Sequence, residues 1–489
     1  MVGTKTLIGV ARLVVAAGVL WVPLALTAAP ADSPSDVTFS KDIAPILQRS
    51  CQNCHRPDGV APMSLVSYED VRPWARAIKQ RTSMGPKAGV MPPWYIEKNI
   101  GLQKYKDDPS LSDEEVTKIA RWSDSGAPRG NPADAPPLLH FDAASVWRIG
   151  PPDLIVRTPD IVVKANAADW WGEGSDLIPV TGLTEDRYVA AVEIKEVNDV
   201  ATHKADRQTV GGRYVVHHMS WSTRMPEVGT ANAVPDDDDI TNWPVHEVGR
   251  NPDYFDPRGA RLLRKGSNIT ITTLHLHSNG AETKSHLEIG FKLLPKGYEP
   301  DYKRSRISLG DGMDMDIQPN ETNQLLHAYA VLDEPTKIVT FEPHLHAPGS
   351  RMCLEAIWGI NIQTLSCAGY DHNWVRGYAY QDDYAPILPK GTVLHIIGYM
   401  DTTAANKNVA DARNWSGSGN RSVANMFIDL GMRVSMTEEQ FQSEMARRRE
   451  KLHLTANDIL IGCPLCNAVA KPGYRAAPPR TTSTAGQNQ

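Results

Sequence analysis

The stretch at residues 50–62 reads SCQNCHRPDGVAP and carries two cysteines, two residues apart, with a histidine directly after the second. Two thiols at this spacing can form thioether bonds to the vinyl groups of one haem, and the adjoining imidazole can then bind the iron. We therefore expect one covalent c-type haem on Cys51 and Cys54, with His55 as an axial ligand. A structural disulfide between the two cysteines is the alternative.

An electron-carrying haem also needs a sixth ligand, and the segment AGVMPPWY supplies Met91. The two prolines that follow hold the backbone extended and stiff. A thioether ligand favours ferrous iron and raises its reduction potential. Met63 and Met84 are the alternative ligands. Since His55 is the only histidine between residues 32 and 136, a haem with two histidine ligands is not expected in this segment.

Three histidine pairs follow, in the motifs VVHHMS, TLHLHSN and EPHLHAP. Side chains alternate between the two faces of a β-strand, so each His-x-His pair places both imidazoles on one face. Adjacent histidines point to opposite faces unless they lie at a strand end or a β-bulge. Three pairs in one β-region predict metal ligands rather than isolated surface histidines. The pairs are His217 and His218, His275 and His277, and His344 and His346.

The ligand types narrow the choice of metal. Zinc would accept three histidines, but a zinc hydrolase also needs a nearby carboxylate base. Copper accepts imidazole in both oxidation states, and a thioether ligand favours Cu(I). A site of two histidines and a methionine would therefore indicate copper.

The surrounding sequence predicts a small all-α domain at residues 37–135. Ser40, Ser67 and Ser112 stand where helix N-caps are expected, and the last two have an acidic residue three positions later. A Pro-rich linker ends this domain. From about residue 140 onwards, β-branched runs bounded by turn residues predict one or two all-β sandwiches.

The composition is that of a globular, multidomain chain. A length of 489 residues is enough for about three domains. Apolar residues make up 41% and charged residues 22%, which excludes a disordered chain. The net charge of −6 is spread without a basic block, so we expect no nucleic-acid partner.

Residues 1–31 are expected to be a signal peptide. Lys5 and Arg12 precede an apolar stretch interrupted by Pro23, and the residues APA then fit a cleavage site. An uncleaved membrane anchor is the alternative, and only in that case do we expect contact with a membrane. In both cases the folded part is periplasmic or secreted, where disulfides are permitted.

Four cysteines lie outside the haem motif. Cys353 and Cys367 flank a segment that would turn near residues 359–361, and such a hairpin places them opposite one another. We expect a cross-strand disulfide between them. The motif CPLC at residues 463–466 is followed by Asn467 rather than histidine, so it is not a second haem site. A disulfide is expected there, with a copper-handling motif as the alternative.

Two families share these motifs. Residues 37–135 resemble the cytochrome c family through the CQNCH motif, the downstream methionine and the closing helix. The order HHM, a later histidine, His-x-His and a distant methionine resembles the type II copper, ascorbate-dependent monooxygenases, which include peptidylglycine α-hydroxylating and dopamine β-monooxygenase. This resemblance implies two consecutive jelly-roll-like β-sandwiches with one copper each. They would span residues 145–300 and 301–437, followed by a tail at 438–489.

Carried over residue by residue, the resemblance gives the ligands of an electron-storing copper in the first sandwich as His217, His218 and His277. His277 is preferred to His275 because it occupies the last position before the turn SNG. The other eight histidines are expected to be structural. They are His140, His203, His246, His286, His327, His372, His395 and His453.

The second copper, which binds O2 in the family, would be held by His344, His346 and Met426. Met400 and Met432 are the alternatives to Met426. The peptide-hydroxylating members clamp a substrate carboxylate with an arginine two positions before this histidine pair, where the present chain has Glu342. An acid cannot make that contact, so peptidylglycine is not the expected substrate. Glu342 either faces a cationic or hydroxyl-bearing substrate or is a structural surface acid.

The resemblance implies an exported monooxygenase that uses O2 to hydroxylate a C–H bond of a small organic molecule. An external donor would reduce the haem, and the tethered haem would supply electrons one at a time to the first copper. A non-catalytic haem and copper carrier is the alternative, while the predicted methionine ligand and the haem disfavour a zinc hydrolase.

Overall fold

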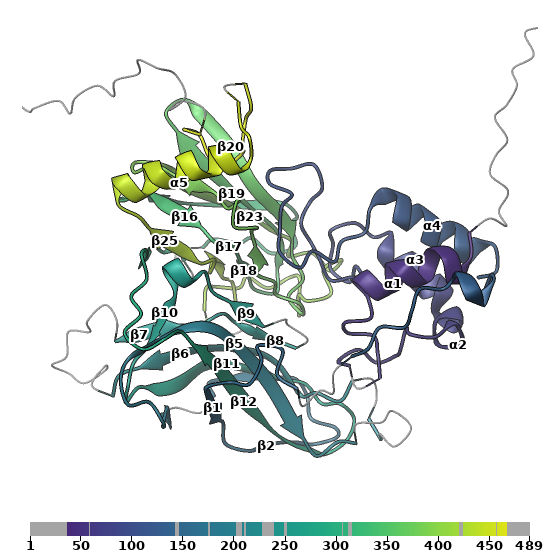
Figure 1. Ribbon diagram of the computed structural model, residues 1–489. Coiled ribbons are helices and arrows are strands. Elements are labelled where there is room, and N and C mark those ends of the chain that lie inside the picture. The colour runs from purple at the N-terminus through teal and green to yellow at the C-terminus, as the bar shows by residue number, and fades with distance from the viewer. Residues whose placement is uncertain are drawn as a thin grey trace, which may run out of the picture.

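The computed structural model describes residues 37–466 with short gaps (Figure 1). The gaps are residues 58, 142–145, 175–176, 202–207, 210–211, 227–238, 249–251, 306, 312–314, 420–423 and 456. The expected signal peptide and the tail beyond residue 466 lie outside the described residues. No helix in the described part is long and apolar enough to cross a membrane.

Most of the described chain is β-sheet, and the few helices lie near its two ends (Figure 1). The helical elements are a π-helical turn at Phe39–Ile43, α1 (Ala44–Ser50), α2 (Tyr68–Val71), a 3₁₀ turn at Arg72–Trp74, α3 (Ala75–Thr82), α4 (Asp113–Asp124), 3₁₀ turns at Pro132–Asp134 and Pro257–Gly259, and α5 (Glu438–Lys451).

Two of the three predicted N-caps are confirmed. Ser67 caps α2, and Ser112 caps α4 as part of a complete capping box. The predicted cap at Ser40 is wrong. Thr38 takes that role because its hydroxyl accepts the Lys41 N–H, and Ser40 lies buried inside the first turn.

The N-terminal helices pack around a small apolar core of their own. Its centre is formed by side chains with no exposed surface, and these are Ile43, Leu47, Val71, Ile119 and Trp122. The helices contributing to this core are α1, α2, α3 and α4. The segment at residues 85–106 is not part of it and packs elsewhere in the molecule.

The first sandwich consists of two antiparallel six-stranded sheets around one core. One sheet has the order β1-β12-β5-β10, with β2 beside β12 and β9 beside β5. Its strands are β1 (Leu154–Arg157), β2 (Ile161–Val163), β5 (Arg187–Asn198), β9 (Asp253–Tyr254), β10 (Arg261–Leu263) and β12 (Thr283–Leu293). The other sheet has the order β3-β11-β6-β7, with β4 beside β11 and β8 beside β6. Its strands are β3 (Trp170–Gly172), β4 (Ile178–Pro179), β6 (Val216–Arg224), β7 (Ile240–Asn242), β8 (His246–Glu247) and β11 (Asn268–Leu276).

The second sandwich is built from smaller sheets. A four-stranded sheet has the order β15-β23-β19-β20, a second β13-β25-β16-β22, a three-stranded sheet β14-β24-β18, and a pair β17-β21. The strands are β13 (Lys303–Arg304), β14 (Leu309–Asp311), β15 (Gln324–Val331), β16 (Thr336–Ile338), β17 (Thr340–Phe341), β18 (Pro343–Leu345), β19 (Gly349–Trp358), β20 (Asn361–Gly369), β21 (Tyr378–Ala379), β22 (Ile387–Leu388), β23 (Val393–Met400), β24 (Phe427–Asp429) and β25 (Arg433–Ser435).

Both predicted disulfides are confirmed. Cys353 and Cys367 face one another across β19 and β20 and are bonded, and the hairpin turns at Gly359, which has a positive φ of 58°. Cys463 and Cys466 form a local disulfide beneath α5.

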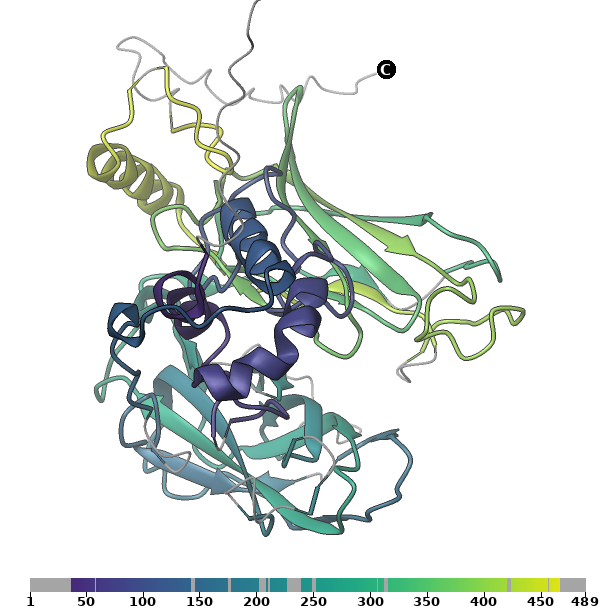
Figure 2. The same cartoon turned by 90° about the vertical axis from the view of Figure 1, so that its right-hand side faces the viewer.

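Residues 85–106, named here the connecting strap, join the helical segment to the second sandwich. The strap runs along β20, where the Glu97 N–H donates to the Cys367 carbonyl (2.9 Å) and the Leu102 N–H to the Leu365 carbonyl (2.8 Å). Its aromatic side chains belong to the core of the second sandwich, and they are Trp94, Tyr95 and Tyr105. The helices α1–α4 stand beside the two sandwiches in Figure 1 and in front of them in Figure 2.

A buried ionic network joins the two sandwiches. Lys337, with 1% of its side chain exposed, donates to Asp256 at 3.1 Å, and Arg258 contacts both Asp256 (2.9 Å) and Glu444 of α5 (3.1 Å). Burial raises the pKa of Asp256, but the Arg258 hydrogen bond and the Lys337 charge outweigh it and lower this pKa to about 2. Asp256 is therefore ionised at neutral pH and neutralises Lys337 of the other sandwich as well as the neighbouring Arg258.

We predict that Asp256→Asn lowers the free energy of unfolding by about 3–5 kcal/mol, because it leaves the buried Lys337 ammonium without its counter-ion. The Asp256 contribution is complete above its ordinary pKa of 3.8 and is lost as the pH falls toward 2. The difference in the free energy of unfolding between Asp256→Asn and the wild type, measured in urea, should therefore shrink as the pH falls from 3.8 toward 2.

The matched control is Asp411→Asn, which removes the partner of the exposed Arg413. The urea midpoint of Asp411→Asn should stay close to that of the wild type. Equal midpoints for Asp256→Asn and wild type at pH 7 would contradict the role of the network.

Candidate metal centre

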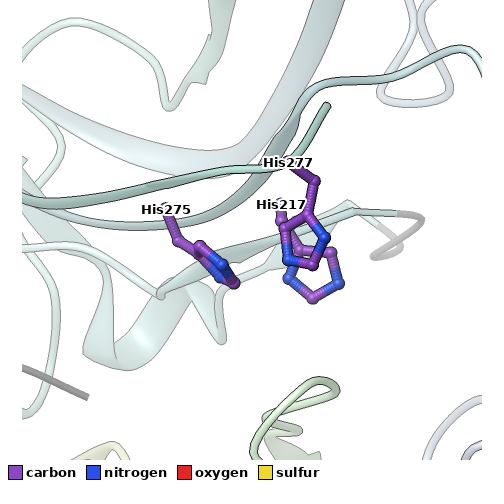
Figure 3. Close-up of side chains that lie close together, drawn as sticks. All are labelled: His217, His275 and His277. Atoms are coloured by element: carbon purple, nitrogen blue, oxygen red, sulfur yellow. The ribbon is translucent and has the colours of Figure 1, made fainter. Parts of the chain in front are cut away.

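Three histidines of the first sandwich converge on one point. One ring nitrogen from each of His217, His275 and His277 lies within 4.8 Å of the other two (Figure 3). His217 comes from the start of β6, while His275 lies near the end of β11 and His277 follows that strand. Within the described residues this is the only such group of three or more histidine, cysteine or acidic side chains. We name it the histidine triad.

A β-bulge places His217 in the triad. Along the β6–β11 ladder His275 lies opposite His218 and Leu276 lies opposite Val216, so His217 is an extra residue on β6. A bulge reorients the side chain of its extra residue, which places His217 beside His275 and His277.

The partly buried Glu196 anchors the backbone before this bulge. Its carboxylate accepts the Val215 N–H (3.0 Å) and the Val216 N–H (2.8 Å), together with the Ser285 hydroxyl (2.9 Å). These bonds hold the chain directly before His217, so Glu196 fixes the start of the bulge.

The structure therefore brings His217 and His277 together as the sequence predicts, but with His275 in place of His218. His218 is buried, and its Nδ1 is 2.8 Å from Oε1 of Glu247 in the neighbouring strand β8. This contact holds the His218 ring away from the triad. The resemblance gave both adjacent histidines of β6 as ligands, and the bulge instead admits only one of them. His275, set aside in favour of His277, is the third member of the triad.

The triad is electrically neutral and its nitrogens are available. Burial, followed by the neighbouring histidines, lowers the pKa of His217 to about 3, and the same causes lower the pKa of His275. Both ring nitrogens of His275 and Nε2 of His277 are buried without a hydrogen bond. Neutral imidazole is the form that binds metals, and a buried nitrogen without a partner is costly unless a ligand occupies it. These residues therefore fit a metal ion.

Asp169 supplies the nearest carboxylate to the triad. Its oxygens lie 3.5 Å from Nδ1 of His277 and 3.7 Å from Nε2 of His275, and its side chain is 57% exposed. The position at the solvent-facing side of the rings allows Asp169 to balance the charge of a bound cation.

The second histidine pair lies in the second sandwich on β18 and the residue after it. The ring centres of His344 and His346 are 5.3 Å apart, with planes at 78°. The Nδ1 of His346 is 3.2 Å from the Ala424 carbonyl, and Nδ1 of His344 is buried without a hydrogen bond. Burial lowers the pKa of His344, so it too is neutral.

Met426 lies beside this pair in the sheet register. β18 pairs with β24 such that Leu345 faces Phe427, and His346 and Met426 are the next residues along the two chains. The rival methionines are engaged elsewhere, because Met400 is fully buried in the second core and Met432 packs against the first. Met426 therefore remains the predicted third ligand.

Two aromatic residues that the sequence did not indicate lie between the triad and this pair. The Trp171 ring stacks on His275 with centres 3.7 Å apart, and His372 lies 5.2 Å from Trp171 and 6.1 Å from His346. Burial lowers the pKa of His372 to about 3. His372 was expected to be structural. It is a lone histidine in a loop, so no spacing to another histidine in the sequence could have placed it here.

The haem motif forms a tight turn after α1. The His55 N–H donates to the Cys51 carbonyl (2.9 Å), and His55 Nδ1 is 3.2 Å from the Met63 carbonyl, which leaves Nε2 available for iron. Cys51 and Cys54 are free thiols, so the alternative of a disulfide between them is not found. These features fit a covalent haem.

Met91 lies in the connecting strap, where its N–H donates to the Arg81 carbonyl at 3.2 Å. The side chains of the alternative ligands are occupied, since Met63 packs on the helical core and Met84 on the core of the second sandwich. Met91 stays the predicted sixth ligand.

The remaining histidines have other surroundings. His395 lies between Glu355 (3.0 Å) and His327 (2.9 Å) on the outer sheet of the second sandwich, and His286 lies 3.7 Å from Asp160. His203 lies outside the described residues. Glu342 is 3% exposed, so the alternative of a surface acid at this position is wrong.

No protein-family model matches the chain, and no curated protein matches it significantly. The likeness to cytochromes c and to type II copper monooxygenases therefore rests on the motifs and on the geometry described above.

We predict that His275→Ala abolishes copper binding at the triad, because it removes one of three converging nitrogens. Copper content and Cu(II) electron paramagnetic resonance (EPR) of purified protein measure the loss. His286→Ala, on another sheet of the same sandwich, is the control and should bind copper like the wild type. If His218→Ala loses the site and His275→Ala keeps it, the ligand assignment is reversed.

Proposed function

We propose that the chain is an exported copper monooxygenase that hydroxylates a C–H bond of a small organic molecule with O2 and receives electrons through its own c-type haem. The observation that carries the proposal is the neutral histidine triad, of which His275 is buried, together with a second histidine pair on the other side of the contact between two sandwiches. The finer fold assignment, a cytochrome c-like domain followed by two jelly-roll-like sandwiches, belongs to this proposal.

The donor set supports copper most directly at the second site. Two imidazoles beside a methionine at His344 and His346 combine nitrogen with a soft sulfur donor, a set that suits copper, and the three imidazoles of the triad are donors that copper also accepts. Copper bound there would supply one-electron redox chemistry and activation of O2. Hydrogen abstraction from a C–H bond requires no side chain as a general base.

The protein groups around the rings fix how they present their nitrogens. The Ala424 carbonyl lies 3.2 Å from His346 Nδ1 and favours a proton on that nitrogen. Carbonyl and carboxylate partners of this kind orient metal-bound histidines and increase their basicity. His275 (2% exposed) and His344 (8%) are buried, whereas the triad opens to solvent at His277, whose side chain is 32% exposed.

The helical segment supports a haem electron carrier. Cys51, Cys54 and His55 would hold the haem, which would supply a one-electron carrier on the same chain. The connecting strap with Met91 is bound to the loop of His372, since Asp371 Oδ2 accepts the Gly89 N–H (2.9 Å) and the Tyr95 hydroxyl (3.3 Å). The two confirmed disulfides agree with export to an oxidising compartment.

The substrate is proposed to lack a carboxylate that needs an arginine clamp. Glu342 stands at that position, buried at the start of β18. A buried acid disfavours an anionic substrate by desolvation and repulsion.

The first test is incorporation of oxygen from ¹⁸O2 into organic products by copper-loaded, reduced protein incubated with a panel of small organic substrates. We predict a labelled alcohol from the wild type and its loss in His344→Ala, because the second site loses a ligand. His395→Ala is the control and should retain product formation. Copper binding without labelled product from any substrate would favour the non-catalytic haem and copper carrier.

The second test concerns the haem. We predict that Cys54→Ala abolishes covalent haem attachment and slows turnover supported by a one-electron donor that reduces cytochromes, while copper content is retained. Haem staining of denatured protein and rates of O2 uptake measure the two effects. A variant without haem that turns over at the wild-type rate would contradict electron delivery through the haem.

A further inference from the structure

The indole of Trp171 occupies the space between the two histidine groups. It stacks on His275 of the triad with ring centres 3.7 Å apart and planes at 20°. It also stacks on His372 of the second sandwich, with centres 5.2 Å apart and planes at 19°. Three aromatic rings from two sandwiches therefore form one nearly parallel stack.

The fold fixes Trp171 at this place. β3 pairs with β11 so that Trp171 lies directly opposite His275, and this register puts the indole on the same face of the sheet as the imidazole. The neighbouring Trp170 faces the other way and is 45% exposed. The alternation of β3 thus assigns one tryptophan to the stack and the other to the surface.

The ring contacts that connect the triad to the second pair pass through Trp171. One series runs from Trp171 to His372 and on to His346 (6.1 Å). The other runs from Trp171 to His218 (5.6 Å) and on to His344 (6.2 Å). Among the described residues, no ring contact joins the triad directly to His344 or His346.

We propose that Trp171 is a positioning residue for electron transfer between the two metal centres, acting through His275 on one side and through His372 and His218 on the other. The inference rests on the proposed function, because it needs redox metals at both places. One electron leaves a reduced copper at the triad, which is oxidised from Cu(I) to Cu(II). The same electron reduces Cu(II) at the second site to Cu(I), and no bond or proton is exchanged.

A covalent route competes with the stack. His217 of the triad is bonded through the backbone to His218, whose ring lies 6.2 Å from His344. This route does not include Trp171, so replacement of the indole distinguishes the two.

The experiment uses the full chain loaded with haem and copper. One electron equivalent is added without oxygen, and the Cu(II) signals of the two sites are followed by rapid-freeze EPR. The variants are Trp171→Leu, which removes the stack, Trp171→Phe, which keeps an aromatic ring, and Trp170→Leu as the matched control. We expect Trp171→Leu to slow redistribution between the sites by at least about tenfold with unchanged copper content and EPR parameters. Trp171→Phe should recover much of the rate, and Trp170→Leu should match the wild type.

A wild-type rate in Trp171→Leu with both coppers bound would overturn the inference and leave the proposed function intact. If Trp171→Leu loses copper, the double variant His372→Leu/His218→Leu carries the test, because it breaks both ring series beyond Trp171 and removes no member of the triad. A wild-type rate in that double variant with both coppers bound would also overturn the role of the stack. A wild-type protein without copper would refute the proposed function itself, and metal content reports that outcome separately.

Discussion

The structure depends on one irregularity, the bulge in β6 that turns His217 toward His275 and His277. In a regular ladder His217 would lie opposite Leu276 and point to the other face of the sheet from His275, and the triad would lose a member. The bulge is held by Glu196, a partly buried carboxylate that accepts backbone N–H groups directly before it, and by Glu247, which keeps His218 in its own position. Two acids therefore decide which of two adjacent histidines joins the triad.

The contact between the sandwiches brings the triad and the second pair into one cluster of rings. The buried Lys337 ammonium of the second sandwich takes Asp256 of the first sandwich as its counter-ion. This requirement specifies how the sandwiches meet, and their meeting places Trp171 between His275 and His372. The connecting strap adds the helical segment to the same assembly through Asp371, one residue before His372. Haem motif, triad and second pair are thus parts of a single packed unit.

The sequence predicts those features of the fold and site that depend on short-range backbone geometry. The Cys-x-x-Cys-His turn, the shared face of each His-x-His pair and the hairpin between Cys353 and Cys367 all follow from short-range geometry. The choice of His275 over His218 depends on a bulge formed by pairing two distant strands and on Glu247 of a third, so spacing along the chain does not contain it. Trp171, His372 and the docking of the strap along β20 likewise depend on contacts between segments remote in sequence.

We propose that the two histidine groups hold copper beside one haem on the same chain. The most direct measurement is the copper, zinc and iron content of the wild-type protein, produced with haem maturation and exposed to both copper and zinc. We expect two coppers for each haem iron, with Cu(II) EPR signals from two nitrogen-ligated sites. One copper or none, or zinc in its place, would refute paired copper sites.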